Sequence, residues 1–596
     1  MKDALHRRDF LRAVGVATVV GPVGVNASAA VAREKADQPN VVLVMTDDQG
    51  YGDLGCHGNS EIKTPNLDKL HAESVRLTNF HVGPTCAPTR ASLMTGRYCN
   101  RTGVWHTVMG RSLLRRDEVT MANVFSAAGY RTGIFGKWHL GDNYPFRPQD
   151  RGFGEVLIHG GGGVGQTPDY WGNDYFDDVY LHNGKRKKFS GYCTDVWFDG
   201  AMKFIETNKD RPFFCYVPTN APHAPYYVAD KYGKPYRDEG IEESRAAFYG
   251  MVTNIDDNMG RLMQQLKDLN LERDTVLIFM TDNGTSGGHR VVNGTERGHN
   301  CHMRGRKGSE YDGGHRVPCF IRWPGGGLSG SRDIGRLTAH IDLLPTLIEL
   351  CELRRPIGVT FDGVNLAALL KNASANGTDR ILVTDSQRIE DPQKWRKSAV
   401  MTDRWRLVNG KELYDMTVDP GQENDVAQDH LWIVARLREA YEDWWADTSK
   451  RFGEYCEIIL GSDKENPSTL TCHDWHSIEG VRQAHSSQRA VRDGAQTSGF
   501  WAVEIAREGI YEFALRRWPA EVDKPINAAV GGGKAIGATK ARLKIADVDV
   551  TKPVPAGARA VTFEVKLKAG KTRLQTWFTN KKGESWGAYY LYVKRS

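Results

Sequence analysis

Cys86 is the residue with the clearest chemical potential, because of the segment around it. The segment Pro84-Thr85-Cys86-Ala87-Pro88-Thr89-Arg90 leads into Ala91, Leu93 and Met94, which have helical spacing. Pro88 suits the first turn of a helix, since its φ angle is fixed and its missing N–H would have no partner there. Cys86 is therefore predicted at a helix N-terminus, where free N–H groups and the helix dipole favour a bound anion. Arg90 would add a cation whose fork suits an oxyanion. A buried or disulfide-bonded cysteine is the alternative for Cys86.

Charged and polar side chains follow four predicted strands. Residues 40–46 and 274–281 are unbroken apolar runs, which predict strands buried on both faces of a parallel sheet. Residues 131–136 and 212–217 are shorter candidates for the same sheet. The first two runs end in Asp47-Asp48 and Asp282-Asn283, and the other two lead to Lys137, His139 and His223.

Helical patterns separate these strands, for example from Ser244 to Leu269, and the alternation predicts an α/β fold. Open α/β sheets bind ligands in the crevice at the carboxyl ends of their strands. We therefore expect the polar residues after the four strands to converge there. A helix cap or solvated turn is the alternative for Asp47-Asp48, and a structural role is the alternative for the two histidines.

The segment from Cys86 to Arg90 resembles the signature of the type I sulfatases of the alkaline phosphatase superfamily, in which the cysteine of Cys-x-Pro-x-Arg becomes formylglycine. The resemblance covers most of residues 38–430. It implies an alkaline-phosphatase-like core with a mostly parallel sheet between helices. Further blocks similar to the family are Thr46–Gly55, Thr64–Leu70, Leu93–Tyr98, Gly136–Gly141, Asn220–His223, Thr281–Gly284 and Arg306–Gly308.

The resemblance also implies a metal site. One divalent cation would be held beside residue 86 by Asp47, Asp48, Asp282 and Asn283. Three carboxylates and one amide form an all-oxygen set that suits a hard cation, so Ca²⁺ is expected, whereas Mg²⁺ would demand a tighter octahedral geometry. Arg90 and Lys137 would stabilise residue 86 and the oxyanions of the substrate.

The family implies a reaction in two steps. The hydrated aldehyde at residue 86 would attack sulfur and form a covalent sulfate ester. His223, the better candidate for the general acid, and Lys307 would lie by the leaving oxygen. His139 would take a proton from the remaining hydroxyl, which expels inorganic sulfate and regenerates the aldehyde. One departure from the family is Asp312, where Glu is usual, and His315 beside it could line the substrate pocket.

Residues 1–32 resemble a bacterial twin-arginine export signal. His6-Arg7-Arg8-Asp9-Phe10 precedes a run of small and apolar residues from Ala13 to Val25, and A-x-A-like cleavage sites follow. We expect a periplasmic or secreted protein without a membrane span after cleavage. An uncleaved anchor is the alternative, although the run is short and contains Gly and Pro. The translocase and the formylglycine-generating enzyme would be partners during maturation.

The 596 residues are too many for one hydrophobic core. The sulfatase core is assigned to residues 38–375, a small α+β subdomain to 376–450 and an all-β sandwich to 465–596. The subdomain helix is expected to pack through Leu431, Val434, Leu437, Tyr441 and Trp444. In the sandwich, Trp518, Trp577 and Trp586 would pack in the core or bind carbohydrate, and packing is favoured.

Two bulk properties bear on partners and on disulfides. The formal net charge of +6 is spread along the chain, so no nucleic-acid partner is expected. The ten cysteines show neither the spacing of a zinc site nor a dense disulfide framework, and Cys456 with Cys472 is one plausible disulfide.

The glycine run from Gly160 to Gly163 lacks the features of a nucleotide-binding loop and is expected at the pocket rim.

The expected activity is hydrolysis of a sulfate monoester on a small molecule or glycan, with sulfated polysaccharide fragments as the natural class. Two alternatives remain. A phosphonate or phosphate monoester hydrolase would use the same fold and nucleophile. A non-catalytic protein that binds sulfated glycans would bind without turnover, even after the substitution Cys86→Ala.

Overall fold

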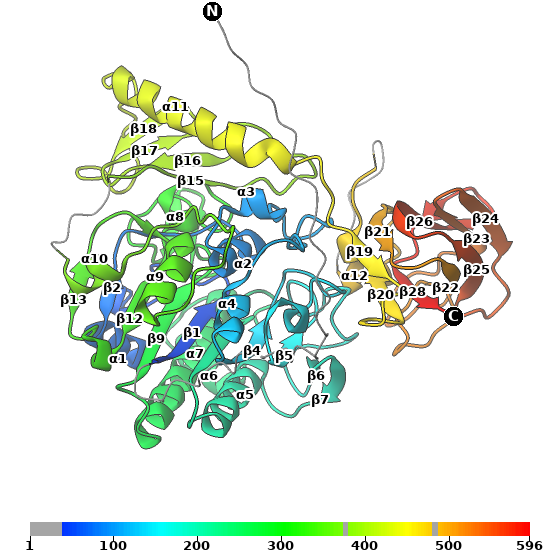
Figure 1. Ribbon diagram of the computed structural model, residues 1–596, viewed down its shortest axis with the longest axis horizontal. Helices are drawn as coiled ribbons and strands as arrows, with labels where there is room; N and C mark the ends of the chain where they lie inside the picture. Colours follow the sequence, from blue (N-terminus) through cyan, green and yellow to red (C-terminus); the bar gives the residue numbers. More distant parts are fainter. Residues whose placement is uncertain (1–37, 374–378, 479–486) are drawn as a thin grey trace, which may run out of the picture. The chain divides into compact units, whose positions relative to one another are not determined.

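A ten-stranded mixed sheet is the element that positions the candidate site (Figure 1). The computed structural model describes residues 38–373, 379–478 and 487–596, so the predicted export signal and the predicted boundary at residue 375 lie outside the described residues. In spatial order the strands are β13 (Arg332–Ile334), β2 (Val75–Leu77), β12 (Cys319–Arg322), β9 (Thr275–Thr281), β1 (Asn40–Thr46), β8 (Phe213–Pro218), β4 (Arg131–Lys137), β5 (Glu155–His159), β6 (Val179–His182) and β7 (Lys185–Lys188).

The centre of this sheet is parallel. Strands β9, β1, β8, β4 and β5 run in one direction, and β12, β6 and β7 add antiparallel neighbours on either side. Strands β1, β4, β8 and β9 are the four that the apolar runs predict, and all four are confirmed within one residue at each end. The predicted α/β fold with a mostly parallel sheet is therefore confirmed.

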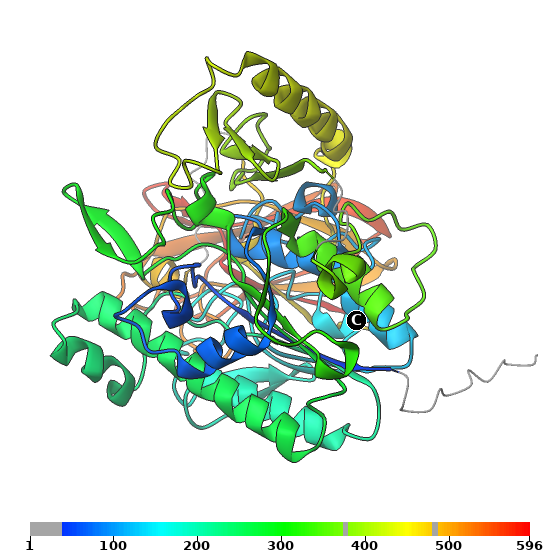
Figure 2. The same ribbon diagram turned by 90° about the vertical axis from the view of Figure 1, so that its left-hand side faces the viewer.

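Helices cover both faces of the sheet (Figure 2). Because side chains alternate along a strand, Leu43 and Met45 of β1 join one hydrophobic cluster, whereas Val42 and Val44 join the cluster on the opposite face. The first cluster contains residues of α2 (Cys86–Thr95), α4 (Met121–Ala127), α9 (Leu343–Leu350) and α10 (Ala367–Lys371). The second contains residues of α1 (Pro65–Glu73), α5 (Cys193–Thr207) and α7 (Glu243–Asp268).

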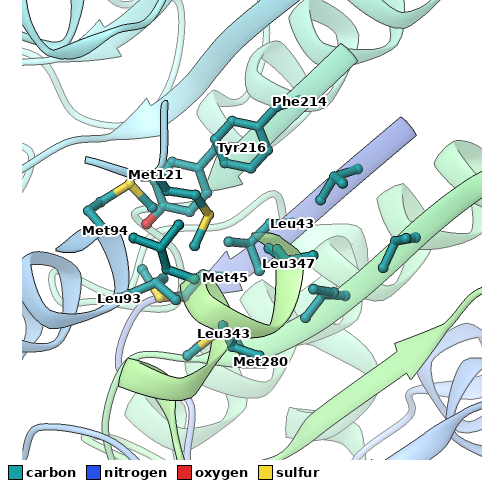
Figure 3. Packing of buried hydrophobic residues seen from close by; sticks show 14 of the residues in the cluster. Leu43, Met45, Leu93, Met94, Met121, Phe214, Tyr216, Met280, Leu343 and Leu347 are labelled. Carbon is teal, nitrogen blue, oxygen red and sulfur yellow. The ribbon is translucent and has the colours of Figure 1, made fainter. Parts of the chain in front are cut away.

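Helix α2 is buried along all ten of its residues. Leu93 and Met94 belong to the same buried cluster as Met45 of β1, Tyr216 of β8 and Met121 of α4 (Figure 3). A helix that is buried on all sides in a close-packed core has little freedom to shift. The predicted helix at Cys86 is confirmed, and its first residue is held in a fixed position at the sheet.

A smaller antiparallel sheet follows, with strands β15 (Leu382–Asp385), β16 (Ser398–Met401), β17 (Trp405–Val408) and β18 (Glu412–Asp415), and with helix α11 (Leu431–Thr448). The buried stripe of α11 contains Ile433, Leu437, Tyr441 and Trp444. The prediction that Leu431 packs here is wrong, since its exposed fraction is 64%. Leu431 lies two residues before Ile433 and therefore on another side of the helix.

Two sheets form the C-terminal part, and all their strand pairs are antiparallel except β19 with β21, which is parallel. One contains β19 (Ile458–Leu460), β21 (Trp501–Ile505), β26 (Gly570–Asn580), β23 (Ala538–Ile545), β24 (Val548–Pro553) and β27 (Ser585–Trp586). The other contains β20 (Ser468–Thr471), β28 (Tyr590–Arg595), β22 (Gly509–Arg516) and β25 (Val561–Leu567). Their shared core includes Trp518 and Trp586, so these two residues pack as expected, whereas Trp577 is half-buried beside Arg542.

The C-terminal core extends to Leu113 and Phe146, which belong to the sulfatase-like part of the chain. Cys456 lies in the same core as a free thiol, so the predicted disulfide with Cys472 is wrong. The Sγ atom of Cys472 instead lies 3.6 Å from Thr167 Oγ1.

The remaining described elements are short connections or surface pieces. Apart from short 3-10 helices, they are α3 (Cys99–Thr102), α6 (Asp230–Asp238), α8 (Asp312–His315), α12 (Gln488–Arg492), β3 (Phe80–His81) with β14 (Thr338–Ala339), and β10 (His289–Val292) with β11 (Thr295–Gly298). In the described part of the chain, no helix combines the length and the apolar character that a membrane crossing requires.

Candidate active site

The residues predicted to form the site meet at the carboxyl ends of the parallel strands. Asp47 and Asp48 follow β1, and Asp282 and Asn283 follow β9. Strand β4 ends at Lys137, and His139 lies two residues further on. The loop after β8 carries His223, a separate loop carries Lys307, and Cys86 is the first residue of α2.

Buried oxygen and sulfur atoms form the centre of this group. One ligand atom each from Asp47, Cys86 and Asp282 lies within 4.8 Å of the other two. The backbone N–H of Asp48 donates to Asp282 Oδ1 over 3.0 Å, and Asn283 Nδ2 donates to Asp48 Oδ1 over 3.0 Å. The five residues predicted to surround a metal are therefore neighbours.

These residues fit a hard divalent cation. Among the described residues, Asp47 Oδ1 and Asn283 Oδ1 are buried oxygens without a hydrogen-bond partner, and buried polar atoms of that kind are costly. Burial, together with the neighbouring carboxylate of Asp47, raises the pKa of Asp282 to about 7. A cation bound here would ligate both orphan oxygens and relieve the repulsion between the carboxylates.

Three cations surround the acidic residues. Lys137 Nζ lies 2.5 Å from Asp47 Oδ2, and Arg90 donates to Asp282 Oδ2 over 2.8 Å. Lys307 Nζ lies 2.5 Å from one oxygen of Asp48 and 2.6 Å from the other. Arg90 also donates to the backbone oxygen of Lys137 over 2.8 Å, so the two cations hold one another in place.

Burial and the nearby cations have opposite effects on the pKa of the Cys86 thiol. Burial raises the pKa of the Cys86 thiol, whereas the charges of Lys137 and Lys307 act to lower it. Burial also acts to raise the pKa of Asp48, but Lys307 and His223 more than offset it, and the pKa falls well below its usual range. The lysines therefore favour negative charge at this end of α2.

The two predicted catalytic histidines differ in their surroundings. His139 is buried, its Nε2 lies 2.8 Å from the oxygen of Thr107, and its Nδ1 has no partner among the described residues. Burial and the charge of Lys137 hold the pKa of His139 well below its ordinary value. His223 Nε2 lies 3.7 Å from Asp48 Oδ2, and burial with the charge of Lys307 lowers its pKa to about 4.

Exposure shows where the site opens. The side chains of His223 and Lys307 are 23% and 19% exposed, whereas Arg90, Lys137 and the acidic residues are almost completely buried. A ligand that reaches residue 86 from solvent would therefore pass His223 and Lys307.

The backbone is unusual at two of these positions. Asp48 has a φ of 69° and His139 a φ of 61°, both in the left-handed region. Such conformations cost on the order of 1–3 kcal/mol each and cluster at functional sites. They turn the chain sharply where β1 and β4 reach the site.

The glycine run after β5 lies directly on the two histidines. A Cβ atom on Gly162 would lie 2.1 Å from His139 Nε2, whereas one on Gly163 would lie 3.6 Å from the Cε1 atom of His223. The segment therefore does more than line the rim of the pocket, because its backbone packs against His139. Only a residue without a side chain allows such a close approach.

His473 is a neighbour of His139 that the sequence motifs missed, with ring centroids 6.1 Å apart. His473 lies far along the chain from His139. The one sequence feature that could have indicated it is the dipeptide His473-Asp474 directly after a strand.

The structure also corrects the expectation that His315 lines the substrate pocket. It is completely buried against His81, while Asp312 pairs with Arg406, so His315 does not line a pocket.

Comparisons with known proteins give one consistent result. The sulfatase family model matches residues 39–353. Arylsulfatase A of Homo sapiens is 34% identical over 419 residues, which cover 65% of this chain and 78% of that protein. N-acetylgalactosamine-6-sulfatase of Homo sapiens is 31% identical over 360 residues, 56% of this chain and 66% of that protein. The crystal structure of Ps i-CgsB in complex with k-i-k-neocarrahexaose has a TM-score of 0.62 and 26% identity, and the match covers 70% of this chain and 95% of that one.

Proposed function

Because the chain belongs to the sulfatase family, whose members are sulfuric ester hydrolases, we propose that it hydrolyses carbohydrate sulfate monoesters with a formylglycine nucleophile made from Cys86. The observation that carries this proposal is the position of residue 86. It begins a buried helix and shares one 4.8 Å group with Asp47 and Asp282. An oxyanion bound there would meet the helix N-terminus and the cations around it.

A formylglycine would supply a hydrated aldehyde with two hydroxyl groups, one to attack sulfur and one whose deprotonation expels sulfate and regenerates the aldehyde. Lys137 and Arg90 would stabilise negative charge on residue 86 and on the sulfate oxygens. Asp47, Asp48, Asp282 and Asn283 would hold a divalent cation, for which we propose Ca²⁺. The cation would supply Lewis-acid stabilisation of negative charge.

The histidines are assigned to proton transfer at opposite ends of the reacting group. The Nδ1 atom of His139 is buried and has no hydrogen-bond partner among residues 38–373, 379–478 and 487–596, and we propose that it accepts a proton from residue 86. His223 and Lys307 lie at the exposed side of the site, where the leaving alcohol would depart, and Lys307 and the protonated form of His223 would hold a proton at its oxygen.

A carbohydrate substrate is supported by the relatives rather than by a bound ligand. One relative is an N-acetylgalactosamine-6-sulfatase, and a structural neighbour holds k-i-k-neocarrahexaose. We also propose that residues 1–32 direct export by the twin-arginine route to the periplasm or beyond, and that residues 38–375, 376–450 and 465–596 are the catalytic domain, the small α+β subdomain and the β-sandwich of the mature enzyme.

The test is turnover by protein produced together with a maturation enzyme. We expect hydrolysis of 4-nitrophenyl sulfate well above that of 4-nitrophenyl phosphonate, and then release of sulfate from one member of a panel of sulfated oligosaccharides. The Cys86→Ala variant should be inactive. Preference for the phosphonate would contradict the proposal, as would tight binding of a sulfated oligosaccharide without turnover by the matured protein.

A further inference from the structure

The segment after β20 brings a histidine and an aspartate to the candidate active site from outside the sulfatase match at residues 39–353. His473 and Asp474 form a short 3-10 helix with Cys472 directly after β20. The side chain of His473 is 2% exposed, and its ring lies next to that of His139. Strand β20 thus places a titratable group beside a residue assigned to catalysis.

The ring of His473 is oriented by one strong contact. His473 Nδ1 lies 2.9 Å from Asp474 Oδ1, which leaves Nε2 buried and without a partner among the described residues. The backbone oxygen of His473 accepts from the N–H of Met109 over 2.8 Å, close in sequence to Thr107, which contacts His139. The position of His473 relative to His139 is therefore fixed through both main chain and side chain.

Two ring nitrogens without a hydrogen-bond partner in the described ranges belong to neighbouring rings. They are His139 Nδ1 and His473 Nε2, and the ring centroids are 6.1 Å apart. Buried polar groups in native proteins are normally hydrogen-bonded, so two unsatisfied nitrogens in neighbouring buried rings point to a polar ligand.

The charge state suits an anionic oxygen. Burial alone would lower the pKa of His473, but the hydrogen bond and charge of Asp474 raise it above its ordinary value. His473 is therefore the more basic ring of the pair, since the pKa of His139 is held well below its ordinary value. A protonated Nε2–H donates a charge-assisted hydrogen bond, which is stronger than a neutral one.

The C-terminal part also holds the glycine run in place. Gln488 of α12 donates to the backbone oxygen of Gln166 over 3.0 Å, and its Oε1 accepts from the N–H of Gly172 over 3.1 Å. Gly162, which contacts His139, lies at the start of the same loop. The C-terminal part therefore contacts the site through the loop as well as through His473.

We propose that His473, oriented by Asp474, is a substrate-binding residue of this sulfatase, and that its Nε2 donates to an oxygen of the sulfate group bound beside His139. The inference rests on the proposed function. It makes the C-terminal part of the chain a contributor to the active site, although the family match ends before it.

The test compares His473→Gln, Asp474→Asn and the wild type, with inorganic sulfate as the probe. Loss of a charge-assisted contact corresponds to about a tenfold or larger effect on binding. We therefore expect the inhibition constant for sulfate and the KM for 4-nitrophenyl sulfate to rise about tenfold or more in His473→Gln, with a smaller rise in Asp474→Asn. Calcium content and aldehyde content at residue 86 should match the wild type.

His476→Gln is the matched control. His476 follows His473 by three residues and is equally buried, but its ring pairs with Glu390. This variant should keep the wild-type inhibition constant even if its melting temperature falls. Unchanged sulfate inhibition in His473→Gln would overturn the inference, and so would a loss confined to kcat, since that would indicate positioning of His139. If the wild type is inactive, the proposed function fails, while calorimetric binding of sulfate still tests His473 separately.

Discussion

Lys307 is the cation of the site that solvent reaches most readily, and it touches both oxygens of Asp48. The substitution Lys307→Ala should lower kcat for 4-nitrophenyl sulfate by about 10²–10³-fold, because removal of one preorganised charge from an active site has effects of this size. Calcium content should stay unchanged, since Lys307 supplies no metal ligand.

Arg304→Ala is the matched control for Lys307. Arg304 lies in the same loop, is about half exposed and contacts Tyr414 and Glu412 rather than Asp48. Its variant should retain most of the activity. Wild-type kcat in Lys307→Ala would remove Lys307 from the catalytic residues.

The orphan oxygens of Asp47 and Asn283 give a prediction about stability. A chelator should lower the melting temperature, and added calcium should restore it, because a ligand that binds only the folded state stabilises that state. In Asn283→Ala the calcium-dependent rise should shrink, as one ligand oxygen is gone. Differential scanning fluorimetry across a calcium titration measures both effects.

Asn258→Ala provides the comparison for Asn283, since Asn258 is equally buried but lies in α7, bonded to Asp195. Its melting temperature can fall, yet its response to calcium should match the wild type. A calcium response in Asn283→Ala as large as that of the wild type would exclude this asparagine as a ligand.

Sequence patterns located most of the acidic and basic residues, because each follows an apolar strand or lies in a family block. Asp47 and Asp282 are examples, at the ends of β1 and β9. His473-Asp474 also follows a strand, but that position alone does not show that His473 lies beside His139. Its proximity to His139 depends on how β20 packs against the rest of the chain, and no local pattern encodes that.

At the scale of elements, the loop after β5 makes the sharpest prediction. In Gly162→Ala the new Cβ atom would lie 2.1 Å from His139 Nε2, so either the loop or the histidine must move. A displacement of about 1 Å in a catalytic group can cost about 10²-fold in rate, and we expect kcat/KM to fall by that order. Steady-state kinetics with 4-nitrophenyl sulfate provides the measurement.

The neighbouring substitution Gly163→Ala controls for the loss of loop flexibility. The nearest atoms to its added Cβ lie at 3.5 Å, which is ordinary contact, so activity should change little. Equal activity losses in the two variants would show that the contact between Gly162 and His139 is not what matters.

Helices and strands with a strong local pattern could be predicted from the sequence. Which side of a helix faces the core was harder to predict. The strand at 40–46 and the helix from Cys86 follow from apolar runs and from Pro88. The face of α11 was misjudged at Leu431, because several apolar residues at helical spacing allow more than one stripe, and only packing on the small sheet selects one.

At the scale of the molecule, the C-terminal core includes Leu113 and Phe146 from the sulfatase-like part. Parts that share a hydrophobic core are expected to unfold cooperatively. Differential scanning calorimetry should therefore show one main transition for the sulfatase-like and C-terminal parts. Two well-separated transitions, with sulfatase activity lost only in the second, would contradict this view of the C-terminal part.

The central claim is that residue 86 acts as a formylglycine in a sulfate ester hydrolase. The most direct measurement is the mass of the tryptic peptide from Leu77 to Arg90, taken from a preparation that hydrolyses 4-nitrophenyl sulfate. We expect an aldehyde at position 86, in a fraction that rises and falls with specific activity across preparations. An intact Cys86 thiol in fully active protein would contradict the account.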